Sequence, residues 1–181
     1  DVNVAPTATE TPSGDRLLID GVPILHVIVP DESQGPAYGM TADWLFRRSG
    51  SDWEQTGAVA DGRVVLADGL VPEQLYRGNH GGCLPQAATA EIAFETSADS
   101  GATWTVQPEG ANVRPLLADP VLVGTVYGSD CGLAISHDSG VTWIRLDPMP
   151  AFPIVDVAVD GTLLYVLGVS VEDDGRLQII D

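Results

Sequence analysis

One eight-residue pattern occurs twice in the chain, and its spacing restricts the possible folds more than any other feature. The pattern is S-x-D-S-G-x-T-W, and it occupies residues 97–104 and 136–143. The tryptophans that end the two octets, Trp104 and Trp143, lie 39 residues apart. A period near 40 residues is the length of one four-stranded blade of a β-propeller. The spacing therefore predicts an all-β chain built from repeated antiparallel four-stranded sheets.

The residue types of the octet suit a tight turn between two strands. Serine and aspartate side chains accept hydrogen bonds from the backbone amides of a turn, and glycine adopts a positive φ without steric cost. Threonine and tryptophan favour the strand that follows. We therefore expect structural roles for the ten residues that the pattern fixes in this way: Ser97, Asp99, Gly101, Thr103, Trp104, Ser136, Asp138, Gly140, Thr142 and Trp143.

The octet resembles the Asp-box, or bacterial neuraminidase repeat, of propellers such as sialidases, sortilin-like sorting receptors and photosystem assembly factors. A shortened third copy follows the strand 44–48 and ends at Trp53. The resemblance implies that each octet joins the third and fourth strands of a blade and lies on the face away from the usual ligand site. It implies a fold rather than an activity, because one fold hosts many functions.

Working outward from the octets divides the chain into about four blades, at 24–56, 63–107, 113–146 and 154–180. Residues 1–14 are interpreted as a flexible Thr/Pro-rich tether, and 15–181 as the propeller domain. The fourth blade lacks an outer strand, and Arg16–Asp20 could supply it and close a ring, because closure removes exposed sheet edges. A segment of a larger propeller and exchange of this strand between molecules remain the alternatives.

The charge of the chain is strongly one-sided. Twenty-six acidic residues against eight basic ones, all of them arginine, give a formal net charge of −18. Long-range repulsion disfavours nucleic acids and acidic membrane surfaces as partners, and no stretch of sequence is apolar enough to cross a bilayer. The tether and the absence of an initiating methionine favour an extracytoplasmic location, whether secreted, periplasmic or at the cell surface.

Two cysteines, Cys83 and Cys131, fall in connections between the second and third strands of adjacent blades. Such connections emerge on the same face of a propeller, so a disulfide between them is expected, with two free thiols as the alternative. No zinc site is expected, because further ligands at suitable spacing are missing.

The candidate ligand-binding residues lie on the face opposite the octets. The loop 78–86 is much longer than its counterpart in the third blade, and long loops of compact domains are often functional. It offers Asn79 and His80, and the neighbouring blade offers Tyr127 and Asp130. A surface loop without a ligand is the alternative. Glu172, Asp173 and Asp174 are weak calcium candidates, since they lack the alternating spacing of a calcium loop. No other cofactor is expected.

The sequence carries no nucleophile elbow, phosphate loop or dinucleotide motif, and no catalytic residue is assigned. The predicted function is therefore a non-catalytic propeller that binds or scaffolds a glycan or protein partner. One alternative is a structural subunit of an oligomer or filament assembled by strand complementation. A second alternative is a glycoside hydrolase of sialidase-like or xyloglucanase-like type, because a chain this acidic always offers pairs of carboxylates.

Overall fold

The computed structural model describes residues 18–19, 21–30, 35–59, 63–79, 92–130, 132–146, 154–168 and 176–180. Within these ranges the chain is all-β, and apart from one 3₁₀ turn at Pro108–Gly110 its regular elements are antiparallel strands. The predicted fold class is confirmed. None of the described residues forms a helix with the length and hydrophobicity that a membrane-spanning segment requires.

Four sheets follow one another along the chain, and we refer to them as the first to fourth blades. The first contains β3 (His26–Ile28), β4 (Tyr38–Met40), β5 (Trp44–Ser49) and β6 (Asp52–Ala58). The second contains β7 (Arg63–Ala67), β8 (Leu75–Asn79), β9 (Phe94–Ser97) and β10 (Thr105–Gln107). The third contains β11 (Arg114–Ala118), β12 (Val126–Ser129), β13 (Leu133–Ser136) and β14 (Ile144–Arg145). The fourth contains β15 (Ile154–Asp160), β16 (Leu163–Gly168) and β17 (Arg176–Ile180).

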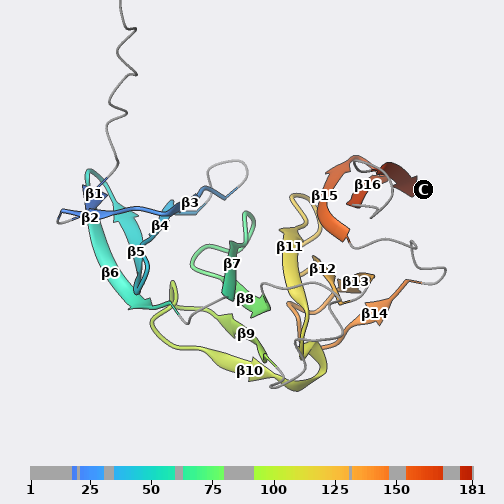
Figure 1. Cartoon of the computed structure of the whole chain (residues 1–181), viewed down its shortest axis with the longest axis horizontal. Helices are drawn as coiled ribbons and strands as arrows, with labels where there is room; N and C mark the ends of the chain where they lie inside the picture. The colour runs from blue at the N-terminus through green and yellow to red at the C-terminus, as the bar shows by residue number, and fades with distance from the viewer. Residues whose placement is uncertain are drawn as a thin grey trace, which may run out of the picture.

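The blades stand side by side along an open arc, from the first in blue to the fourth in red (Figure 1). Each sheet keeps its strands in chain order, as the blade layout predicts. The first strand of the third blade, β11, contacts β7 and β8 of the second blade and β15 of the fourth. The arrangement is therefore propeller-like, with the first strands of the second, third and fourth blades meeting at the inside of the arc.

The hydrophobic core is divided into layers between successive blades. Neighbouring residues of a strand point to opposite faces of its sheet, so an inner blade contributes to two layers: in the second blade Leu75 packs towards the first blade and Tyr76 towards the third. The buried members of the three layers are, in blade order, Tyr38, Leu45, Ala67 and Leu75; Tyr76, Phe94, Val113, Ala118 and Val126; and Tyr127, Leu133, Ile154, Val157, Leu164 and Val166.

The segment expected to close the ring pairs elsewhere. Strand β1 (Leu18–Ile19), which belongs to the predicted strand Arg16–Asp20, forms an antiparallel pair with β2 (Val22–Pro23). Gly21 adopts a φ of +80° in the intervening turn, which permits this tight reversal. A short loop also costs less closure entropy than a link to the distant fourth blade. This strand therefore does not complete the fourth blade of its own chain, whose described strands are β15, β16 and β17.

Candidate functional site

Each octet forms the turn between the third and fourth strands of its blade, and a closed set of hydrogen bonds holds it. Ser97 Oγ accepts the amide of Gly101 at 2.8 Å and donates to Asp99 Oδ1 at 2.8 Å. Asp99 in turn accepts the amide of Thr103 at 2.8 Å and its hydroxyl at 2.6 Å. In the second octet Ser136 Oγ accepts the amide of Gly140 and donates to Asp138 Oδ1, both at 2.8 Å. Asp138 accepts the amide of Thr142 at 2.8 Å and its hydroxyl at 2.7 Å.

The same bonds set the ionisation of the two aspartates. The Thr103 hydroxyl and amide lower the pKa of Asp99. Burial raises the pKa of Asp138, but the donors of Thr142, Ser136 and Val141 together more than offset it, so that its pKa is also lowered. A general acid at neutral pH needs a raised pKa instead. Both carboxylates are thus committed to the turn.

A second repeated turn joins the first and second strands of the second and third blades. Asp68 Oδ1 accepts the amides of Leu70 and Val71 at 2.8 and 3.0 Å, and Asp68 Oδ2 accepts the Tyr76 hydroxyl at 2.7 Å. In the third blade Asp119 Oδ1 accepts the amides of Val121 and Leu122 at 2.8 and 2.9 Å, and Asp119 Oδ2 accepts the Tyr127 hydroxyl at 2.9 Å. This turn was not predicted from the sequence, although 67–76 and 118–127 both begin Ala-Asp and end in tyrosine.

Tyr127, expected at the ligand face, lies in the core. Only 8% of it is exposed, and its hydroxyl bonds to Asp119 at the octet end of the blade. Burial, followed by this hydrogen bond, raises the pKa of Tyr127 to about 12. The structure therefore gives this side chain a place in the layer between the third and fourth blades rather than at the opposite face.

The face opposite the octets is built by the other ends of the same strands, and we call it the loop end. In the second blade Arg63 pairs with Asn79, and in the third Arg114 pairs with Ser129. The amide of Asn79 donates to the carbonyl of Val113 at 3.0 Å, which joins the two blades at this level. The loop end thus brings together residues of adjacent blades, including Asn79 and, one residue beyond Ser129, Asp130.

The carboxylates near the loop end are paired with arginines. Asp130 accepts from Arg145, with Nε at 3.1 Å. Glu95 accepts from two guanidinium groups: from Arg77 Nε at 2.7 Å and from Arg63 Nη1. Burial, aided by the charge of Arg63, lowers the pKa of Arg77 to about 10. Two arginines on one carboxylate leave an excess of positive charge between the first and second blades.

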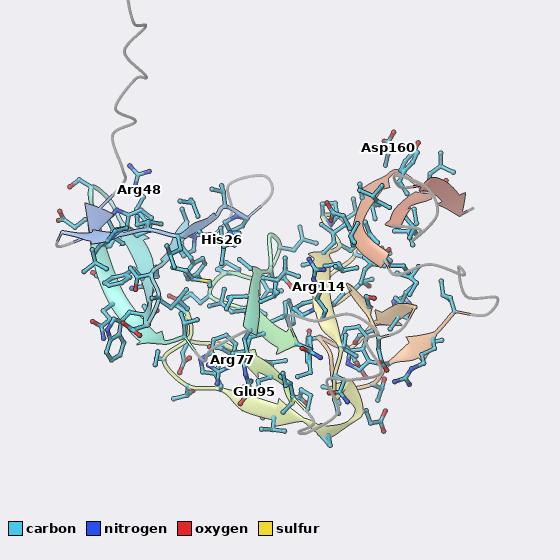
Figure 2. The ribbon with its side chains drawn as sticks, in the orientation of Figure 1. His26, Arg48, Arg77, Glu95, Arg114 and Asp160 are labelled. Atoms are coloured by element: carbon cyan, nitrogen blue, oxygen red, sulfur yellow. The ribbon has the colours of Figure 1, made fainter. Side chains whose placement is uncertain are left out.

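Arg114 differs from these arginines because its Nε has no hydrogen-bond partner among the described residues. Its Nε is buried and unbonded, and among the described residues Arg114 forms no ion pair, whereas Arg47, Arg63, Arg77 and Arg145 do. A buried donor left unbonded costs about 1–3 kcal/mol. Figure 2 places Arg114 on β11, near the middle of the arc. A ligand oxygen at this point would satisfy the free donor.

Several predicted positions fall outside the described residues: His80, Cys83, Cys131, Glu172, Asp173 and Asp174. In the part of the chain that is described, no group of three or more His, Cys, Asp or Glu side chains is arranged to hold a metal ion. Of the expected ligand residues, the structure therefore brings Asn79 and Asp130 to the loop end and adds Arg114. A binding role for Arg114 was not predicted, because the sequence does not show whether an arginine side chain has a hydrogen-bond partner.

The fold and this site define a class: an all-β repeat protein of propeller-like blades, with a buried arginine Nε that has no bond to any described residue where two blades meet. Beyond that class, neither a family model nor a curated protein matches the chain.

Proposed function

We propose that this protein is a secreted or surface-exposed, non-catalytic propeller of the Asp-box type that binds a glycan or protein partner at its loop end. The observation that carries the proposal is the buried, unbonded Nε of Arg114. A polar group without a partner is uncommon in a folded protein, and a partner supplied by a ligand accounts for it.

The chemistry of the loop end limits the ligand. A guanidinium presents a rigid fork of donors that suits carbonyl, hydroxyl and carboxylate oxygens. The net charge of −18 repels polyanions at long range. A neutral glycan, or a protein segment that presents one or a few oxygen acceptors, fits both conditions.

Four described carboxylates are already bonded to other groups of the protein, and this favours binding over hydrolysis. Asp99 and Asp138 are bonded into their turns, and Glu95 and Asp130 are paired with arginines. A glycosidase needs one carboxyl group that holds its proton and a second that acts as base or nucleophile. Turnover on a panel of aryl glycosides would support the hydrolase alternative over the binding proposal.

Replacement of Arg114 by glutamine should weaken binding at the loop end. The protein would be screened on an array of neutral oligosaccharides, and the best-bound one titrated by calorimetry. We expect Arg114→Gln to raise Kd by tenfold or more, because a hydrogen bond from a charged group contributes about 1.5–3 kcal/mol. The control is Arg47→Gln, whose arginine pairs with Glu54 and Glu73 at the octet end. An unchanged Kd for Arg114→Gln, or an equal loss in both variants, would refute the site.

We also propose that Cys83 and Cys131 form a disulfide, as an oxidising extracytoplasmic location permits. Asn79, which precedes Cys83, is joined to the third blade at Val113, and the adjacent Arg114 pairs with Ser129, which precedes Cys131. The described parts of the two segments therefore belong to neighbouring blades that are bonded at this end. Alkylation of the unfolded, unreduced protein followed by intact-mass analysis should add no alkyl group. Two added groups would show free thiols instead.

A further inference from the structure

The outward face of the first blade carries exposed apolar side chains. Leu25, Val27 and Val29 are 65%, 49% and 70% exposed. They alternate along β3 and its flanks, so they share one face. Ile28 lies on the opposite face and packs with Tyr38 in the layer towards the second blade. The three exposed residues therefore face away from the rest of the arc.

Only part of this outward face is covered. Ile19, Ile24 and Trp53 surround Gly39 of β4, and Ile19 is only 4% exposed. The hairpin β1–β2 therefore covers the middle of the sheet and leaves the inner strand β3 uncovered within the described residues.

The same outward face carries a positive charge. Arg47 points to the second blade, where it bonds to Glu73 at 2.5 Å. Arg48 follows it on β5 and so points outward; it is exposed, and its Nε donates to the carbonyl of Gly50 at 3.1 Å. The outward face of the first blade is therefore apolar with a cation.

The outward face of the fourth blade is apolar with anions. Val157 and Val166 pair with one another and are buried against the third blade. The flanking pairs, Asp156 with Leu167 and Ala158 with Tyr165, consequently point outward, as does Asp160 with Leu163. Leu167 is 41% exposed. Arg48 and Asp160 lie at opposite ends of the arc (Figure 2).

We propose that these two faces bind each other between copies of this chain, head to tail. We call the face of a blade that points to the next blade in the chain its forward face, and the face that points to the preceding blade its backward face. Every internal layer joins the forward face of one blade to the backward face of the next. The exposed face of the fourth blade is a forward face, and that of the first is a backward face, so they are the pair that this repeat stacks. Their charges have opposite signs, and both are present in every copy. The inference does not depend on the proposed ligand site.

A head-to-tail contact closes into a ring if its rotation allows and otherwise continues as a filament. The contact differs from strand exchange, because whole sheet faces stack and every strand keeps its own partners. An additional layer between copies would bury Leu25, Val27 and Val29 in the way that the internal layers bury their residues.

The test is the solution mass by size-exclusion chromatography with light scattering, in about 0.15 M salt so that the repulsion between acidic copies is screened. The chain mass is 19.0 kDa, and we expect a species of at least two copies. A monomer across the accessible concentrations would overturn the proposal.

Charged substitutions identify the two faces. Val27→Lys and Leu167→Asp should each reduce the species to a monomer, because each places a charge in one face of the contact. A mixture of the two variants should recover a complex, since it contains one unaltered contact and one in which Lys faces Asp. The control Val106→Asp, at a residue 54% exposed on β10, should leave the mass unchanged, and circular dichroism verifies the fold of each variant.

Two outcomes of the substitutions would contradict head-to-tail stacking. If Val27→Lys gives monomers and Leu167→Asp does not, the first blade binds its own equivalent in the partner. If the mixture stays monomeric while the parent protein associates, the two faces do not meet.

Discussion

Replacement of Phe94 by alanine is expected to lower the free energy of unfolding by about 3–5 kcal/mol, the cost of removing a large buried aromatic side chain. Phe94 is 0% exposed, and its ring centre lies 5.0 Å from that of Trp143, edge to face, and 6.2 Å from that of Tyr76. These contacts join β9 of the second blade to the octet of the third. Urea unfolding followed by tryptophan fluorescence measures the change.

The matched control is Val106→Ala, which removes apolar atoms from a side chain that is already 54% exposed. Substitutions at such sites change stability by about 0.5 kcal/mol or less. The free energy of unfolding of a small domain is only about 5–15 kcal/mol, so Phe94→Ala should remove a large fraction of it. A loss for Phe94→Ala no larger than that of the control would mean that the layer between the second and third blades does not hold the protein together.

Replacement of Gly140 by alanine should be the second severe change. Gly140 has a φ of +86°, and a Cβ there would lie 2.3 Å from the Phe94 ring atom Cε1. The left-handed backbone costs about 1–2 kcal/mol for a residue with a Cβ, and overpacking adds about 1–3 kcal/mol. The ring cannot move aside freely, because Trp143 holds it. We therefore expect a loss of about 3 kcal/mol in urea unfolding.

Gly50→Ala separates the two costs in that experiment. Gly50 also has a positive φ, +61°, but a Cβ there would meet nothing within 4 Å. Its substitution should cost only the backbone strain of about 1–2 kcal/mol. Equal losses at the two positions would show that the contact between Gly140 and Phe94 contributes nothing.

The turn geometry of the octets could be predicted from the sequence, because the donors and acceptors that fix it lie within eight residues. The turn at Asp68 and Asp119 is equally local, yet it was missed. Its two copies lie 51 residues apart, whereas the octets lie 39 apart, because the long connection after Asn79 separates the first half of the second blade from its second half. A search at one fixed period does not find both.

The pairing of the N-terminal strand and the unbonded Nε of Arg114 could not be predicted in the same way. Several partners were open to Arg16–Asp20, and the turn at Gly21 selects the nearest one. Whether an arginine at the start of a strand has a partner depends on which side chains its own sheet and the neighbouring blade place within reach. Arg63 finds Glu95 across its own sheet, and Arg114 finds no carboxylate among the described residues.

The division of the core into layers has a consequence for how the protein can come apart. The second and third blades each share one layer with the blade before and one with the blade after, whereas the first and fourth blades share one layer each. Stability is therefore coupled between nearest neighbours, as in linear repeat proteins. A substitution at Phe94 weakens the layer between the second and third blades, and so the coupling between the two halves of the arc, but leaves the other two layers intact. Cooperativity in this molecule is therefore a property of its three junctions, and the stability of each sheet depends on the one or two sheets that it touches.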